Sequence, residues 1–190
     1  MNRVHRWYCR SGHWRRTVRE RLLPWVLGST DLGADVLEVG PGPGLTTDVL
    51  AERVARLTCV EKDPRLAAAL ARRTAGSNVT VVEGDATRLP FERGRFSGAV
   101  SCTMLHHVPS PELQDRLLAE VARVLAPGAW FVGSDSLTSA VFRAVHWRDT
   151  LVPVDPDAFG ARLERAGFVD ARVERAGRAF RFRARAVAAP

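Results

Sequence analysis

The residues best suited to chemistry gather around a glycine-rich stretch, Val36–Gly44, which reads VLEVGPGPG. Gly40, Gly42 and Gly44 alternate there with prolines, directly after a short apolar run. Because glycine has no Cβ atom, a ligand can lie against the backbone at such a place. Glu38, two residues before the first glycine, would suit a cationic end of that ligand better than a phosphate.

Two phosphate-binding loops do not fit this spacing. The dinucleotide fingerprint G-x-G-x-x-G would place its third glycine one position beyond Gly44. Pro41 and Pro43 also lack the N–H donors that a pyrophosphate requires. A P-loop needs a lysine directly after its glycines, whereas the only lysine of the chain is Lys62. The glycine stretch therefore points away from phosphate ligands.

The elements around this loop alternate between strands and helices, which predicts a parallel α/β sheet. Short apolar runs predict strands at 36–39, 57–60, 79–82, 97–101 and 130–133. Helical spacing, capping residues and prolines predict helices at 11–27, 43–54, 64–73, 111–125 and 156–166. In the first helix, Pro24 is expected to cause a kink or the end of the helix.

Two further segments, 168–174 and 179–187, close the chain with alternating apolar and polar residues. They are too close in sequence for a crossover helix, so they are predicted to pair as an antiparallel hairpin through Ala176 and Gly177. The second segment would place its apolar residues on one face and its basic residues on the other: Phe180, Phe182 and Ala184 against Arg181, Arg183 and Arg185. The arginine side is expected to be solvated or to meet a partner, and not to lie under a core helix.

Five motifs together resemble those of class I S-adenosylmethionine-dependent methyltransferases. VLEVGPGPG is similar to the first motif of that family, an E/D-x-G-x-G-x-G core. The later landmarks follow in order as CVEKD, EGDATRLPF, FSGAVSCTMLHHV and LAEVARVLAPGAWFVGSD. The resemblance covers residues 33–187 and is nearest to the small-molecule branch known as type 11.

The resemblance implies a Rossmann-like, mostly parallel seven-stranded sheet with helices on both faces. The strand order would be 3-2-1-4-5-7-6, with the antiparallel hairpin at the C-terminal end. The chain would divide into an N-terminal helical lid, residues 1–30, and a methyltransferase domain, residues 31–190.

The resemblance also implies S-adenosyl-L-methionine as the cofactor and S-adenosyl-L-homocysteine as the product. The residues that it assigns to the cofactor lie at the ends of successive strands: Glu38, Gly40, Gly42, Gly44, Glu61, Lys62, Asp85, Ala86 and Ser101. Gly40 and Gly42 would let the backbone lie against the methionine part, which Ser101 would border. Lys62 would lie along the adenine, and the Ala86 N–H would meet a ring nitrogen.

The three acids of this set would each meet a different part of the cofactor. Glu38 would face the ammonium group, directly or through water, and Glu61 would accept hydrogen bonds from the ribose hydroxyls. Asp85 would accept a hydrogen bond from the adenine amino group. Either Glu61 or Asp85 alone would suit a solvated loop, whereas acids at successive strand ends of one sheet favour a single site.

Two histidines follow the fourth strand, where this family places the methyl acceptor. His106 could remove a proton from a phenol or enol, which makes it the candidate catalytic residue; alternatively, it only shapes the loop. Cys102 could act as a thiol nucleophile, but it lacks the sequence context of cytosine C5-methyltransferases, which favours a buried, inert cysteine. No histidine or cysteine pair has the spacing of metal ligands, so no metal site is predicted.

The expected function is transfer of a methyl group to an oxygen or carbon atom of a small, apolar or aromatic acceptor. Aromatic residues in 1–30 and 136–155 would cover the acceptor or only pack these segments onto the sheet. The alternatives are a methyltransferase of RNA or another nucleic acid, and a non-catalytic cofactor-binding protein. The Asn/Asp-Pro-Pro-Tyr motif of amino-methylating nucleic-acid enzymes is absent after the fourth strand, which favours the small acceptor.

Charge is spread unevenly along the 190 residues, whose net charge is +7. Residues 1–21 hold seven arginines against one acid, and residues 161–190 hold eight arginines against three acids. Such ends could bind nucleic acid, anionic lipid or an acidic substrate, or only keep two faces soluble. No apolar run reaches the about 20 residues that span a bilayer, and three distant cysteines indicate a reducing cytoplasm. We expect a monomer or homodimer, with peripheral membrane contact left open.

Overall fold

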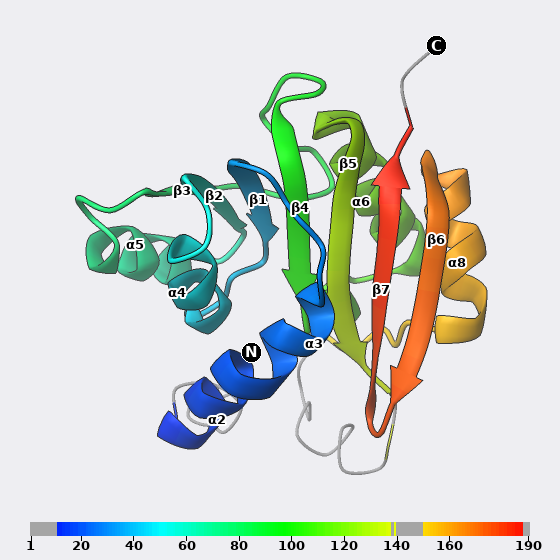
Figure 1. Cartoon of the computed structure of the whole chain (residues 1–190), viewed down its shortest axis with the longest axis horizontal. Helices are drawn as coiled ribbons and strands as arrows, with labels where there is room; N and C mark the ends of the chain where they lie inside the picture. The colour runs from blue at the N-terminus through cyan, green and yellow to red at the C-terminus, as the bar shows by residue number, and fades with distance from the viewer. Residues whose placement is uncertain (1–10, 138, 140–149, 188–190) are drawn as a thin grey trace.

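A computed structural model describes residues 11–137, 139 and 150–187, which build one sheet with helices on both faces (Figure 1). The strands are β1 (Asp35–Val39), β2 (Arg56–Glu61), β3 (Val79–Glu83), β4 (Phe96–Cys102), β5 (Leu125–Ser136), β6 (Phe168–Ala176) and β7 (Ala179–Ala186). Their order across the sheet is β3-β2-β1-β4-β5-β7-β6, which confirms the predicted order. β1 to β5 pair in parallel, and β7 runs antiparallel to both β5 and β6.

The helices follow the sequence signals closely. They are α2 (Gly12–Thr17), η1 (Val18–Leu22), α3 (Leu23–Leu27), α4 (Leu45–Ala51), α5 (Pro64–Arg73), η2 (Leu105–His107), α6 (Pro111–Val124) and α8 (Pro156–Arg165). The three longest begin alike. The side chains of Asp63, Ser110 and Asp155 accept hydrogen bonds from N–H groups of the first turn, and a proline follows each of them.

The sheet separates two hydrophobic clusters, one on each face. The segment α2–η1–α3 packs with α4 and α5 on one face, whereas α6 and α8 cover the other. Strand residues alternate between the two sides, so Val36 joins the first cluster while Leu37 and Val39 join the second. This alternation decides which side chains at the strand ends can reach a ligand.

The N-terminal helix does not end at Pro24 but continues to Leu27. Its irregularity lies one turn earlier, where the Leu23 N–H bonds to the Val18 carbonyl and η1 forms a π-turn. A proline ring clashes with the carbonyl four residues before it, and a wider turn relieves that clash. The helix was therefore predicted correctly, but its irregularity lies before Pro24, at Val18–Leu22, and not at the proline itself.

β5 is longer than the run predicted at 130–133. Phe96 of β4 pairs with Leu125, the register then shifts, and Gly98 pairs with Trp130. The Pro127-Gly128 pair, which follows the helix predicted at 111–125, lies within this irregular part of β5. β5 begins before the predicted start at residue 130 because Leu125 already pairs with Phe96 of β4.

The C-terminal hairpin pairs as predicted, with Phe180, Phe182 and Ala184 all buried. Its outward face is not wholly free, because α3 reaches Arg181. The Arg181 guanidinium donates to the Trp25 carbonyl at 2.5 Å and lies 5.7 Å from the centroid of the Trp25 ring. The expectation of an uncovered arginine face is therefore wrong for Arg181.

Candidate active site

A cavity of about 1130 Å³ opens at the carboxyl ends of β1, β2 and β4. In an open parallel sheet, ligands collect at this edge, where the strand order reverses between β1 and β4. The glycine loop, the ends of β2 and β3 and the turn after β4 form its polar part. Trp14, Val18 and Leu22 of the N-terminal helix form an apolar wall.

Gly40 and Gly42, the first two glycines of the loop, lack a Cβ atom for different structural reasons. The Gly40 N–H donates to the Val60 carbonyl at 2.9 Å, and a Cβ atom at Gly40 would come within 2.1 Å of Met104 Cγ. Gly42, with a φ of +55°, faces the cavity, and a Cβ atom there would meet nothing within 4 Å. Gly40 thus makes room for a protein side chain, and Gly42 leaves room in the cavity.

Glu61, at the end of β2, braces the glycine loop and also lines the cavity. Its Oε2 accepts a hydrogen bond from the Gly42 N–H at 2.9 Å, and its Oε1 accepts one from the Asp63 N–H at 2.9 Å. Each carboxylate oxygen has two acceptor positions, so each retains one for a ligand donor. Glu61 can therefore hold the loop and bind a pair of hydroxyl groups at the same time.

Lys62 and Asp85 lie side by side on the cavity wall. The Lys62 ammonium is 2.6 Å from Asp85 Oδ2, and Asp85 Oδ1 accepts from the Thr87 N–H and hydroxyl at 2.9 and 2.8 Å. Burial pushes the pKa of Asp85 upward, but the bonds from Lys62 and Thr87 outweigh it and hold that pKa below its usual range. Asp85 is therefore ionised at neutral pH, and Ala86 next to it also lines the cavity.

Glu38 is buried beneath α4 and does not line the cavity. Its carboxylate accepts hydrogen bonds from the hydroxyls of Thr46 and Thr47 and from the Cys59 thiol. Burial raises the pKa of Glu38 above its ordinary value, although the two threonines partly oppose that effect. Thr46 itself lines the cavity, so Glu38 is one hydrogen bond away from it.

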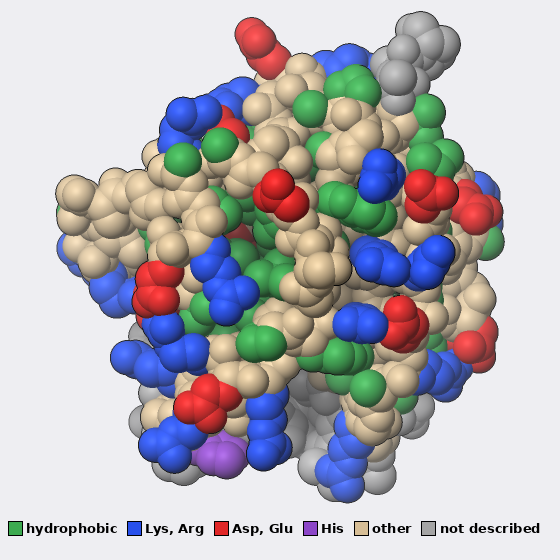
Figure 2. Space-filling view, viewed as in Figure 1, with side chains coloured by type: hydrophobic (Ala, Val, Ile, Leu, Met, Phe, Trp, Pro, Cys, Tyr) green, Lys and Arg blue, Asp and Glu red, His purple; other side chains and the backbone are tan. Residues whose placement is uncertain are grey.

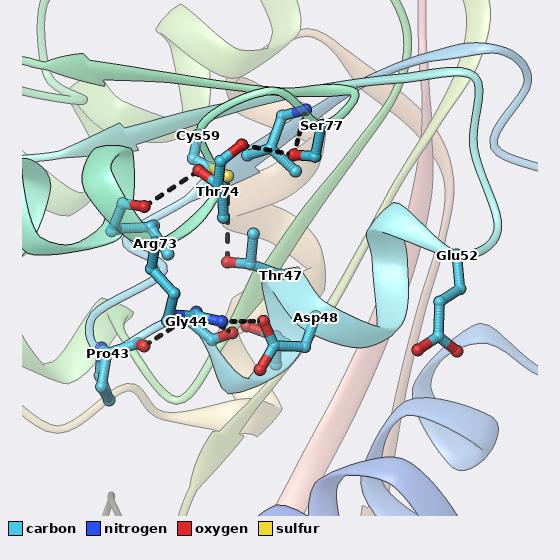
Figure 3. A network of polar contacts seen from close by, with 12 residues as sticks. Pro43, Gly44, Thr47, Asp48, Glu52, Cys59, Arg73, Thr74 and Ser77 are labelled. Atoms are coloured by element: carbon cyan, nitrogen blue, oxygen red, sulfur yellow. Dashed lines mark hydrogen bonds and ion pairs between the residues drawn. The ribbon is translucent and has the colours of Figure 1, made fainter.

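Gly44 is the left-handed residue before α4, and it does not line the cavity either. Arg73, from the last turn of α5, reaches across to this turn (Figure 3). It donates to the carbonyls of Pro43 and Gly44 at 3.3 and 3.1 Å and pairs with Asp48. The sequence analysis missed Arg73, because a basic residue in a last helical turn already has an ordinary role at the helix terminus.

The two histidines after β4 occupy different places. His106 is buried, and its Nδ1 lies 2.5 Å from Asp135 Oδ1 while its backbone N–H donates to Asp135 Oδ2 at 3.0 Å. His107 lines the cavity, and the centroids of the two rings are 4.2 Å apart. The structure therefore places the predicted catalytic residue, His106, behind the cavity wall and its neighbour on that wall.

Ser101 and Cys102, at the end of β4, divide in the same way. Ser101 is buried and does not line the cavity, whereas Cys102 does. Burial raises the pKa of the Cys102 thiol to about 12, so the thiol is protonated at neutral pH. A protonated thiol fits the prediction of an inert cysteine, but Cys102 is half-buried and lines the cavity, so the expectation that it is buried is wrong.

The described residues contain neither a cluster of metal ligands nor a membrane-spanning helix. Among residues 11–137, 139 and 150–187, no group of three histidine, cysteine or acidic side chains could hold a metal ion. In the same ranges, no helix is long and apolar enough to cross a membrane.

The aromatic residues expected over the acceptor are only partly described. Trp14 lines the cavity and Trp25 contacts the hairpin. The others, Trp7, Tyr8, Phe142, His146 and Trp147, lie outside the described residues. Val18 and Leu22 line the cavity as well. They follow Trp14 at intervals of four residues, and this spacing indicates in the sequence that the three side chains share one face of the helix. The division of the chain at residue 30 stays a prediction.

Comparison with known proteins agrees with this geometry. A family model described as Methyltransferase domain, of type 11, matches residues 37–133, just over half of the chain. The chain therefore belongs to the class I S-adenosylmethionine-dependent methyltransferases. The matched residues run from β1 into β5 and include the glycine loop, Glu61, Asp85 and His106.

Two curated relatives differ in how much of the chain they match. 2-Methyl-6-phytyl-1,4-hydroquinone methyltransferase 2 of Oryza sativa subsp. japonica is 31% identical over 171 residues, which are 87% of this chain and 47% of the rice protein. A probable ribosomal RNA small subunit methyltransferase A of Thermococcus onnurineus is 46% identical over 76 residues, 40% of this chain and 27% of that protein. The chain thus spans less than half of the length of these relatives.

A solved structure shares the fold at low sequence identity. It is the complex between the Haloferax volcanii Trm112 methyltransferase activator and a putative methyltransferase. The TM-score is 0.75 at 13% identity, and the likeness covers 99% of both chains. At that identity the likeness concerns the fold alone.

Proposed function

We propose that this chain transfers a methyl group from S-adenosyl-L-methionine to an oxygen or carbon atom of a small, apolar or aromatic acceptor. The observation that carries the proposal is the continuity of a single cavity. Its polar part holds the glycine loop with Glu61 and Asp85, and its apolar wall consists of Trp14, Val18 and Leu22. A polar, hydroxyl-rich cofactor and an apolar acceptor would thus meet in one space.

The polar part fits the chemistry of S-adenosylmethionine. Glu61 has acceptor positions for two ribose hydroxyls, and Asp85 is an ionised acceptor for an amino group. Gly42 would let the methionine part approach the backbone, whereas Gly40 makes room for Met104. Lys62 and the Ala86 N–H would border the adenine. When bound, S-adenosylmethionine supplies a methyl group that the positive charge on sulfur already activates.

Three residues assigned from the sequence would act indirectly in this proposal. Glu38 would reach the ammonium group through Thr46, whose hydroxyl binds it and whose side chain lines the cavity. Gly44 and Ser101 would support the site from behind, because neither lines the cavity.

The chain contributes mainly position. Orienting an acceptor against an activated methyl group is worth about 7–11 kcal/mol, and a base is needed only if the acceptor must lose a proton. In this proposal the His107 ring, which lines the cavity, accepts that proton. His106, the candidate from sequence, would act as a positioning residue that anchors the turn through Asp135.

A second candidate function is methylation of RNA. The Thermococcus relative named as a ribosomal RNA methyltransferase supports it at 46% identity. That match spans 40% of this chain, whereas the rice hydroquinone methyltransferase matches 87%. The breadth of the second match favours a small aromatic acceptor.

One experiment in two stages tests the proposal. Calorimetry with S-adenosylhomocysteine first measures cofactor binding without any acceptor. Release of S-adenosylhomocysteine from S-adenosylmethionine is then followed with alkylated hydroquinones and, separately, with ribosomal RNA. Turnover with a hydroquinone supports the proposal, turnover with RNA alone supports the second candidate, and binding without turnover supports a non-catalytic protein. Absence of cofactor binding would refute all three.

A further inference from the structure

The β6–β7 hairpin has an outer face that the described helices leave largely uncovered. In the view of Figure 1, β5, β7 and β6 face the reader, with α8 behind β6 and the N-terminal helix in front of the sheet beside β4. Residues opposite each other in an antiparallel pair share a face. The register places Arg172 opposite Arg183 and Val169 opposite Arg185. We call these four residues the arginine face.

Folding alone does not explain the charges of the arginine face. Arg181 beside it has an acidic partner, Glu174, at 2.5 Å, but Arg172, Arg183 and Arg185 form no ion pair among the described residues. Like charges that face each other across a sheet reduce its stability. Trp130 and Glu174 offset part of this repulsion, and an anionic partner that meets the cluster would offset the rest.

An aromatic ring holds two of these arginines on the sheet. The guanidinium groups of Arg183 and Arg185 lie 5.8 and 4.3 Å from the centroid of the Trp130 ring. Such cation–π contacts leave the guanidinium N–H donors available to an outside acceptor. The charges are therefore held in place while their hydrogen-bond donors stay usable.

Exposed apolar side chains accompany the charges. Val169 and Val187 are the exposed large hydrophobic residues of the described chain, at 46% and 47% of their surface. Val169 is opposite Arg185, and Val187 follows the last residue of β7. RNA would place polar phosphate and sugar groups against these valines. A bilayer surface, by contrast, takes up apolar side chains beside its headgroups. The mixture of arginine and valine favours lipid.

The N-terminal helix adds positive charge to the same side of the molecule. Figure 2 shows basic side chains both over this helix and over the β6–β7 hairpin. Arg15, Arg16 and Arg21 are exposed on the helix, whose Trp14 and Val18 line the cavity. The basic helix and the arginine face thus lie on the same side of the sheet.

We propose that the arginine face docks this protein on an anionic lipid bilayer. Basic side chains near such a surface each strengthen binding about fivefold, and the flanking valines add apolar contact. Because the basic helix also forms the apolar wall of the cavity, docking holds the cavity beside the bilayer. The proposal goes beyond methyl transfer and does not depend on it.

Flotation of the full chain with vesicles tests this docking without any cofactor. We expect binding to phosphatidylcholine vesicles that contain phosphatidylglycerol, none to phosphatidylcholine alone, and weaker binding as salt rises. The variant R172Q/R183Q/R185Q should bind on the order of a hundredfold more weakly. Val169→Ser keeps the charge and should also weaken vesicle binding.

A matched control removes the same charge elsewhere. R72Q/R88Q/R93Q changes three exposed arginines in α5 and in the loop between β3 and β4, and it should float as the unchanged chain does. Equal losses in both triple variants would reduce the effect to net charge and overturn the proposal. Failure of the unchanged chain to float at low salt would overturn it too. So would binding of single-stranded RNA that depends on the arginine face but not on Val169.

Discussion

Two strand ends of the same sheet, that of β2 and that of β5, hold the cavity in opposite ways. At β2, Glu61 both anchors the glycine loop and faces the cavity. At β5, Asp135 is fully buried and anchors the turn η2 through His106. His107, the next residue of that turn, faces the cavity. One end joins support and ligand contact in a single carboxylate, and the other divides them between two side chains.

The two strand ends therefore differ in which properties a single substitution changes. In the proposed role of Glu61, a change there should affect the loop and the ligand together, because the same two oxygens would serve both. A change at Asp135 should affect the turn alone, and a change at His107 should affect the acceptor alone.

The largest effect is expected for His107→Ala. If the His107 ring accepts the acceptor's proton, its loss should slow methyl transfer roughly 10²–10⁴-fold while affinity for S-adenosylhomocysteine stays unchanged. Single-turnover kinetics and calorimetry would measure the two quantities. His13→Ala, at an exposed position of α2, is the matched control and should leave both unchanged. An unchanged rate in H107A would remove the base from the mechanism.

Asp135→Ala should lower the free energy of unfolding by about 3 kcal/mol, because buried donors lose their acceptor. Three donors depend on this carboxylate: the His106 N–H, the His106 ring and the Ser136 N–H. Urea unfolding would measure the loss, with Asp135→Asn expected to lose less. A change below 1 kcal/mol would mean that the anchor is not Asp135.

Glu61→Ala should weaken binding of S-adenosylhomocysteine by roughly 2–3 kcal/mol. Both the ligand hydroxyls and the Gly42 N–H lose an acceptor, so affinity and stability should fall together. Calorimetry and urea unfolding on the same sample would show this. Loss of stability with unchanged affinity would give Glu61 the purely supporting role of Asp135.

Gly42→Ala should weaken cofactor binding by placing a methyl group where the ligand lies, and its positive φ should cost about 1–2 kcal/mol of stability. Gly76→Ala is the control. Its φ is +79°, it also meets nothing within 4 Å, and it lies outside the cavity. Equal stability losses with binding weakened only in G42A are expected from thermal unfolding and calorimetry. Unchanged binding in G42A would show that no ligand lies against this glycine.

The smallest effect concerns the pH dependence of Glu38. Burial raises the pKa of the folded-state carboxyl, so its contribution to stability is complete below the ordinary glutamate value and is lost as pH rises through the folded value. Glu38→Gln does not titrate. The unfolding free energy of the variant minus that of the unchanged chain should therefore increase with pH. A constant difference would mean that Glu38 is charged in the folded protein.

Much of the fold was predictable because it follows local rules. Strand runs, capping residues and prolines located α5 to the residue, and the short hairpin connection required antiparallel pairing. Where prediction failed, a neighbouring element decided the outcome. Phe96 extends β5 backward, and the π-turn shifts the disturbance away from Pro24.

The sequence predicted where the site lies in the fold better than it predicted which side chains contact one another there. Glycines and acids at strand ends marked the cavity, but no sequence pattern tells which of His106 and His107 faces it. Arg73 braces the loop from a helix distant in sequence, so only the folded chain reveals it. For Glu38 a signal existed, since strand alternation puts it on the same face as Val36, under α4.

The π-turn at Val18–Leu22 makes the helix that forms the cavity wall tolerant of a one-residue deletion. Such a turn holds one residue more than an ordinary helical turn, so deleting one residue there would let a regular helix form. Because the wide turn already absorbs the extra residue, the helix on either side of the deletion would keep its orientation around the axis. Trp14 would therefore stay on the cavity wall, and the helix could lose one residue here without changing the surface that it presents to the cavity.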